Sequence, residues 1–208
     1  LRVCAGDALK ELGEPAKAVV PDMLKACGTV DPEDPRAFLT RGLAFSLFYP
    51  GGALGKAGLL GKSIEGIDRN LLYPAIRQVV RNDDGRARGC MRSTYKYLTK
   101  EDIKALAPDI AKAIAEKAPS GEMFAKGVRL AGIQMLAKYH IKEGMPLCFD
   151  AIDFNWGGLS VECLDVLKQY GANALPLLKE KEKEWTVNAE TAKKYASLLE
   201  KLRAVVKE

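Results

Sequence analysis

Apolar residues recur at intervals of three and four along almost the whole chain, which is the spacing of one buried face on an α-helix. The alternation of apolar and polar residues that marks a half-buried strand never lasts for more than a few positions. The last stretch follows the helical pattern most clearly, through Ala192, Tyr195, Leu199, Leu202 and Val206. Asn188 before this stretch is a favoured N-cap. The pattern predicts an all-α protein whose last helix begins after Asn188.

Capping residues and prolines divide the pattern into separate helices. One helix is expected over residues 86–98, with a buried face of Ala87, Met91, Thr94 and Leu98. Thr99 and Asp102 resemble a capping box at the start of the next helix. Further helix starts are expected at Asp34-Pro35, with a helix to about Leu47, at Pro108-Asp109, at Pro146, and after Ser120 and Ser160.

Two distant segments share one design, a helix, a glycine, and a second helix that opens with a proline. The first runs from Leu9 and Leu12 through Gly13 to Val20-Pro21, and the other from Leu164 and Leu167 through Gly171 to Leu175-Pro176. Each glycine can adopt positive φ at the end of the first helix, and each proline suits the first turn of the second. Weaker copies end at Pro108 and Pro146, and Leu72-Tyr73-Pro74 is expected to open another second helix.

These pairs resemble HEAT repeats, especially the short bacterial type named after phycobilisome lyases. The resemblance covers nearly all of the chain. First helices near 35, 85, 121 and 160 give intervals of about 50, 36 and 39 residues against the roughly 40 of such repeats, and the 50 reflects an insertion. It implies one domain over residues 1–208, a right-handed α-solenoid of about five helical hairpins and a terminal capping helix. Lyase activity is not implied, because the shared residues are helix-packing positions.

Residues 49–67 interrupt the repeats with a glycine-rich insertion inside the second pair. Its Gly61-Lys62-Ser63 matches the end of the phosphate-binding P-loop motif, but Lys56 stands where that motif needs its first glycine. We therefore expect an irregular surface loop, in which Lys56 and Lys62 are candidates for contact with an acidic partner.

A basic stripe is the strongest candidate for binding a polyanion. Arg88, Arg92 and Lys96 recur every four residues of the helix expected over 86–98 and are expected to point away from the core. Arg77 adds to the local charge, and Tyr95 and Tyr97 could stack on bases. Asp83, Asp84, Glu101 and Asp102 partly cancel this charge, so an ordinary solvated helix face remains the alternative.

Composition narrows the class of protein. The 208 residues include 32 basic and 27 acidic side chains, which gives a net charge of +5, and 48% are apolar, as in ordinary globular domains. Five scattered cysteines without a Cys-x-x-Cys pair favour a reducing compartment such as the cytoplasm over a disulfide framework or zinc site. The chain starts at Leu1 without a methionine, so we expect a processed chain or a piece of a longer protein, from which any targeting signal would be missing.

The remaining candidates for chemistry have simpler structural interpretations. His140, the one histidine, is expected to cap a helix end, and its pairing with Cys148 as a catalytic dyad is disfavoured. Trp156 and Trp185 are expected to fill seams between repeats, with anchoring of a partner as the alternative. We expect no catalytic residue, metal or cofactor.

Two functions remain open. The first is a non-enzymatic scaffold that recognises a protein or peptide on the stacked second helices, where Arg77 and Lys112 are expected. The alternative is nucleic-acid binding, or base excision as in HEAT-like DNA glycosylases, through the basic stripe.

Overall fold

The computed structural model describes residues 2–52, 55–153 and 160–206, and over these ranges the chain is helical with no strand. The predicted all-α class is confirmed. The α-helices are α1 (Arg2–Leu12), α2 (Val20–Gly28), α3 (Phe38–Phe48), α4 (Arg69–Arg81), α5 (Gly85–Gly89), α6 (Met91–Thr94), α7 (Lys100–Ala115), α8 (Glu122–Lys138), α9 (Gly144–Asp153), α10 (Ser160–Leu167), α11 (Leu175–Trp185) and α12 (Ala189–Val205). Short 3-10 helices are η1 (Glu14–Val19), η2 (Tyr95–Tyr97) and η4 (Gly171–Ala174).

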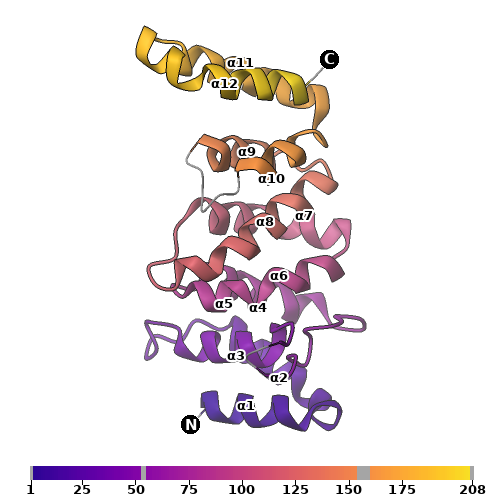
Figure 1. The fold of residues 1–208 in the computed structure, drawn as a ribbon. Helices are drawn as coiled ribbons and strands as arrows, with labels where there is room; N and C mark the ends of the chain where they lie inside the picture. Colours follow the sequence, from indigo (N-terminus) through magenta and orange to yellow (C-terminus); the bar gives the residue numbers. More distant parts are fainter. Residues whose placement is uncertain (1, 53–54, 154–159, 207–208) are drawn as a thin grey trace. The chain divides into compact units, whose positions relative to one another are not determined.

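Residues 1–135 and 136–208 form two compact units. In the first unit the helices pack as two rows (Figure 1). The first row contains α1, α3 and the pair α5 and α6, and the second row contains α2, α4 and α7, each helix packing on its neighbour in the row. Leu24, Leu47, Leu72, Ile76 and Ile103 are among the fully buried side chains of this unit.

The second unit packs α9 on α10, and α12 on both α10 and α11. Leu199 and Leu202 bury the apolar face of α12. Trp185 at the end of α11 is buried and stacks on Tyr195, with ring centroids 4.6 Å apart. Trp185 therefore fills a core position, as expected, whereas Trp156 lies outside the described residues.

Several predicted helix ends are confirmed. Asn188 accepts the Thr191 N–H at 3.0 Å, and Thr99 accepts the Asp102 N–H while Asp102 accepts the Thr99 N–H, which completes the expected capping box. Pro21 and Pro176 lie in the first turns of α2 and α11, and Gly13 and Gly171 have φ of 67° and 51°.

Three proline-based predictions are wrong. Pro108 lies inside α7 and Pro74 inside α4, because the capping residues Thr99 and Asp68 begin these helices earlier. Each proline removes one backbone hydrogen bond inside its helix, and the helix continues through it because the cap and the buried apolar face outweigh that loss. Asp34 precedes α3 by four residues, since the left-handed φ of 50° at Ala37 delays the helix to Phe38.

The described residues of the insertion, 49–52 and 55–67, are non-helical as expected, and residues 58–60 are hydrogen-bonded to the end of α3. The N–H groups of Gly58, Leu59 and Leu60 donate to the carbonyls of Tyr49, Ser46 and Leu47 at 2.8, 2.9 and 2.7 Å. A Cβ on Gly61 would lie 2.1 Å from the Tyr49 carbonyl oxygen. These glycines therefore allow close backbone approach, and the helix after Lys62 begins only at Arg69.

Among the described residues, none of the helices combines the length and apolar character that a membrane span requires.

Candidate binding surface

The helix expected over residues 86–98 is present as α5, α6 and η2 in succession. Its predicted apolar face is confirmed, because Ala87, Met91, Thr94 and Leu98 are all buried. The Asp84 carboxylate accepts the Arg86 N–H at 2.8 Å and caps the start of α5.

Arg88 does not face solvent, so this part of the predicted basic stripe is wrong. Its side chain is 4% exposed and reaches under α7. Arg88 Nε donates to the Asn82 carbonyl at 2.7 Å, and Nη1 donates to the carbonyls of Ala113 and Glu116 at 3.3 and 2.9 Å. The guanidinium thus occupies the C-terminal end of α7, where the helix leaves carbonyls unsatisfied and a positive charge is stabilising.

A second buried arginine shares this place. Arg129 of α8 is 4% exposed, and its Nη2 donates to the Glu116 carbonyl at 2.9 Å. Its Nη1 pairs with Glu122 Oε1 at 2.6 Å. Burial lowers the pKa of both Arg88 and Arg129, and the Glu122 carboxylate opposes this shift in each. The two arginines close the end of α7 and are unavailable to a ligand.

Tyr95 is also buried, contrary to the expectation that it could stack on a base. Its side chain is 2% exposed, and it lines a small cavity with Arg88, Val128 and Arg129. Burial raises the pKa of its hydroxyl. Tyr95 is therefore a core residue.

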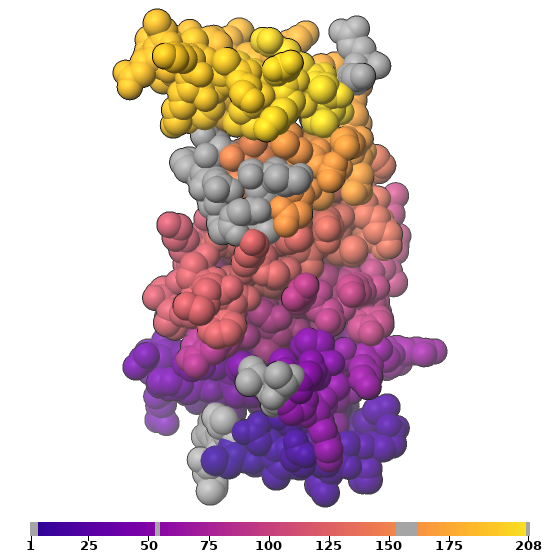
Figure 2. Space-filling model, viewed as in Figure 1, coloured from indigo at the N-terminus to yellow at the C-terminus, as the bar shows by residue number. Residues whose placement is uncertain are grey.

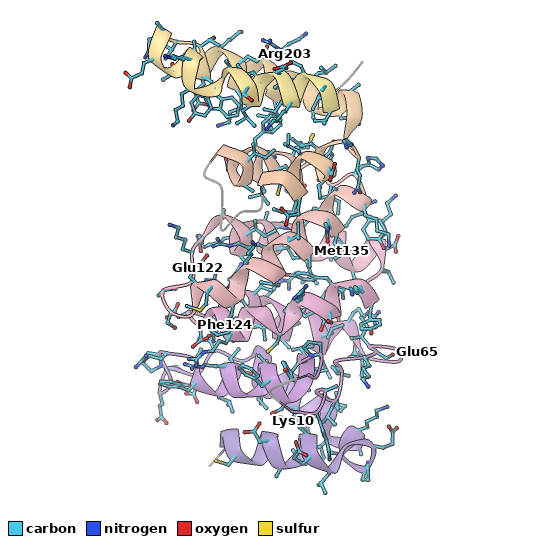
Figure 3. The ribbon with its side chains drawn as sticks, viewed as in Figure 1. Lys10, Glu65, Glu122, Phe124, Met135 and Arg203 are labelled. Carbon is cyan, nitrogen blue, oxygen red and sulfur yellow. The ribbon has the colours of Figure 1, made fainter. Side chains whose placement is uncertain are left out.

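The exposed part of the stripe continues onto α8. Arg92 and Lys96 are exposed as predicted, and the start of α8 adds exposed Met123, Phe124 and Lys126 beside them. A Cβ on Gly127 would lie 3.0 Å from Arg92 Cδ, so the Arg92 side chain lies directly against α8. We call Arg92, Lys96, Met123, Phe124 and Lys126 the α6–α8 surface. Glu122 and Phe124 mark its position on α8 in Figure 3, and the coral residues of Figure 2 belong to the same helix.

Asp84, taken from the sequence as a charge that cancels the stripe, is a buried hub instead. Its carboxylate is 2.9 Å from Arg41 and 2.7 Å from Arg86, and it faces the Ser120 hydroxyl at 3.4 Å. Hydrogen bonding from Arg86 is the main cause that lowers the pKa of Asp84 to about 2. Asp84 therefore holds α3, α5 and the start of the α8 segment together.

Arg77 lies on the second row, where α4 aligns polar side chains with acids on α7. Its Nε donates to Asp109 Oδ2 at 2.9 Å, and Arg81 contacts the same carboxylate. Nearer the start of both helices, the Asp102 carboxylate of α7 accepts a hydrogen bond from Arg69 Nε at 3.0 Å and another from the Tyr73 hydroxyl at 2.7 Å. Burial acts to raise the pKa of Asp102, but the bonds from Arg69, the Thr99 amide and Tyr73 hold it below its usual value.

The two lysines of the insertion differ in whether they pair with an acidic side chain. Lys56 Nζ is 3.1 Å from Glu11 Oε2, so this exposed lysine already has an acidic neighbour within the chain. Lys62 is exposed and makes no ion pair among the residues that the structure describes.

A separate open groove of about 470 Å³ lies between α2 and the approach to α3. It is lined by apolar and charged groups of both signs, namely Asp22, Lys25, Ala26, Thr29, Val30, Asp31, Pro32 and Leu39.

His140 lies at the C-terminal end of α8, as expected, and its backbone is in the left-handed conformation, which is uncommon for a residue other than glycine. Its φ is 53°, its N–H donates to the Ala137 carbonyl at 2.8 Å, and the Ile141 N–H donates to the Leu136 carbonyl at 2.8 Å. This is the Schellman pattern, in which glycine is usual at the left-handed position. Cys148 is fully buried, and a hydrogen bond with Cys163 is the main cause that raises the pKa of its thiol.

Sequence reasoning did not find Met123, Phe124, Lys126 or the pair of the buried Arg129 with Glu122. The dipeptide Met123-Phe124 was a usable signal, because it begins a helix at positions that stay outside the apolar period of Ala125, Val128 and Gly132. Arg129 pairs with Glu122 seven residues earlier on the same helix and with the Glu116 carbonyl 13 residues earlier, a local spacing that was also a usable signal.

No family model, curated protein or solved structure matches this chain.

Proposed function

We propose that this chain is a non-enzymatic binding module, a right-handed α-solenoid of HEAT-like hairpins that recognises a protein or peptide on its second helices. The observation that carries the proposal is the side-by-side packing of α2, α4 and α7 in the first unit. Such a row presents equivalent helix faces in sequence, and an extended face of this kind suits recognition of a long surface. The step from this arrangement to a function is analogy.

The polar contacts between α4 and α7 support the same assignment. Arg77 and Arg81 are 39% and 50% exposed, and Asp109 holds both guanidinium groups in a defined position. Lys104 and Lys112 are exposed on the neighbouring α7. Side chains that are already ordered lose little conformational entropy when a partner binds.

The experiment uses the full chain as bait for binding proteins, with the double variant Arg77→Ala, Lys112→Ala. Arg81 still pairs with Asp109 in this variant, so we expect unchanged helicity by circular dichroism together with loss of the captured partner. Lys193→Ala, an exposed lysine of α12, is the matched control and keeps the partner. Equal capture by the double variant and the control, or turnover of a small substrate, contradicts the proposal.

Nucleic-acid binding is the second proposal, supported by the exposed Arg92 and Lys96. Arg88 and Tyr95 leave this proposal because they are buried, whereas Tyr97 is 41% exposed and remains as the aromatic residue of the stripe on which a base could stack. If a labelled oligonucleotide binds, its affinity falls steeply with salt, and Arg92→Ala with Lys96→Ala reduces the slope by about one per lost phosphate contact. Binding that is independent of salt or of both residues removes this alternative.

A further inference from the structure

The α6–α8 surface places two large apolar side chains in solvent. Met123 is 80% exposed and Phe124 is 51% exposed, and they are consecutive residues in the first turn of α8 (Figure 3). Exposed apolar residues that occur singly need no explanation, whereas adjacent large ones rimmed by polar groups mark interaction sites.

Close helix packing brings charged side chains beside this pair. A Cβ on Gly89 would lie 3.0 Å from the Phe124 carbonyl oxygen, and a Cβ on Gly127 would lie 3.0 Å from Arg92 Cδ. The two glycines therefore let α8 lie directly on the α5–α6 segment. Phe124 and Arg92 belong to one continuous surface as a result, although 32 residues separate them in the chain.

The cations of this surface are unpaired. Arg92, Lys96 and Lys126 make no ion pair or hydrogen bond with any residue that the structure describes. Two acids of the same segments are already paired, because Glu122 of α8 binds Arg129 at 2.6 Å and the Ala118 N–H at 2.5 Å, while Asp84 before α5 binds Arg41 and Arg86. Arg92 and Lys126 thus place free positive charge beside an apolar pair, and Lys96 adds a third free charge on η2.

We propose that the α6–α8 surface binds an acidic segment of a partner protein, with an apolar side chain of that segment against Met123 and Phe124. Phenylalanine, methionine and arginine are enriched in the cores of protein interfaces, and complementary charge sets register and partner choice. This surface belongs to the α5, α6 and α8 side of the first unit, so the proposal goes beyond the recognition proposed for α4 and α7.

Two other occupants fit the surface less well. A nucleic acid could stack a base on Phe124, but it would gain nothing from Met123, the more exposed of the two, because methionine offers no ring. An anionic membrane would meet exposed Asp83 and part-exposed Glu122 near the same turn. An acidic peptide can avoid both carboxylates by the spacing of its own charges.

The test is a selection of 15-residue peptides from a random displayed library on the full chain. We expect the selected peptides to be rich in Asp and Glu around one or two large apolar residues. The double variant Met123→Ser, Phe124→Ser lowers their affinity about ten-fold or more, the loss typical of a truncated anchor. Leu12→Ser is the matched control, because Leu12 is an exposed apolar residue on a different helix, α1. This variant keeps full affinity for the peptides.

Charge reversal tests the other half of the proposal. Arg92→Glu with Lys126→Glu abolishes binding of the acidic peptides, and the same peptides with Lys in place of Asp and Glu bind this variant instead. Lys193→Glu is the control for charge at a distant exposed site.

Three results overturn the proposal. One is selection of peptides without acidic enrichment, and another is equal binding to the Met123→Ser, Phe124→Ser variant and to Leu12→Ser. The third is tighter binding of a labelled oligonucleotide or of phosphatidylserine vesicles than of the peptides, with loss in the same variants. Thermal unfolding of each variant confirms that the fold is intact. If a binding protein is lost only in the double variant Arg77→Ala, Lys112→Ala, that protein binds the separate α4–α7 site.

Discussion

Replacing Arg88 with methionine removes the guanidinium that closes the end of α7 and keeps an unbranched apolar side chain of similar length. Three backbone carbonyls lose a donor, those of Asn82, Ala113 and Glu116. Glu116 keeps the bond from Arg129 Nη2 at 2.9 Å. The buried Asn82 carbonyl and the part-buried Ala113 carbonyl therefore lose the bond that Arg88 supplies.

The size of the effect follows from this count. A buried acceptor left without its donor costs about 1–3 kcal/mol, so two cost about 2–6 kcal/mol. Two terms offset this cost, because methionine avoids the desolvation of a charged group and removes repulsion between Arg88 and Arg129, both visible in the lowered pKa values. We expect Arg88→Met to lower the free energy of unfolding by about 2–4 kcal/mol.

Urea unfolding followed by circular dichroism at the helical band measures the difference. Arg92→Met is the matched control, because Arg92 is exposed four residues away and makes no ion pair among the described residues. A surface change of this kind alters stability by about 0.5 kcal/mol or less. Equal unfolding midpoints for the two variants would refute the burial of Arg88 and restore the exposed basic stripe that the sequence predicts.

Three further predictions follow from single contacts. The pKa of Asp84 is lowered to about 2 by its arginine partners, so its ionised form stabilises the fold above about pH 4, and this stability is lost as the pH falls through 2. Asp84→Asn therefore lowers the unfolding free energy by about 1–2 kcal/mol at pH 7 and by progressively less in acid, which unfolding curves from pH 7 to 2 can check. His140→Gly raises the melting temperature, because glycine relieves about 1 kcal/mol of left-handed strain at φ 53°, and a lower melting temperature contradicts the assigned Schellman geometry. Gly58→Ala places a Cβ 2.6 Å from the Leu47 carbonyl and costs about 2 kcal/mol or more in urea unfolding, so a neutral result would show that the insertion does not dock on α3.

Local signals in the sequence predict helix ends well when a side chain satisfies the backbone itself. Asn188 and Thr99 cap α12 and α7 as expected, and Gly13 and Gly171 have the positive φ that their positions require. Prolines are poorer signals, since Pro108 is compatible with a helix that begins at Thr99. A cap adds a hydrogen bond, whereas a proline only removes one, so the cap determines where the helix begins.

The basic stripe shows why the site was harder to predict than the fold. Successive positions four residues apart rotate by about 40° around a helix, so Arg88, Arg92 and Lys96 spread over an arc of about 80°, wide enough to begin at the core and end in solvent. Arg88 falls beside Ala87 and Tyr95 on the buried side, whereas Lys96 reaches solvent. The carbonyls that accept from Arg88 come 25 and 28 residues later in the chain, and nothing in the local pattern indicates them.

The contacts of the arginines determine which part of the positive charge is available to a partner. Arg88 and Arg129 are occupied at the end of α7, and Arg41 and Arg86 hold Asp84. Ion pairs that join neighbouring segments reduce the positive electrostatic potential that these arginines create at the surface. Arg92 and Lys126 have no such partner among the described residues, so their positive potential remains beside Met123 and Phe124. Charge that is neutralised inside the fold contributes to stability and register, and charge that remains free beside an apolar pair contributes to recognition. The net charge of +5 is therefore a weaker guide to partners than the local balance around α8, where a variant that moves one acid next to Lys126 would weaken an acidic ligand without changing the fold.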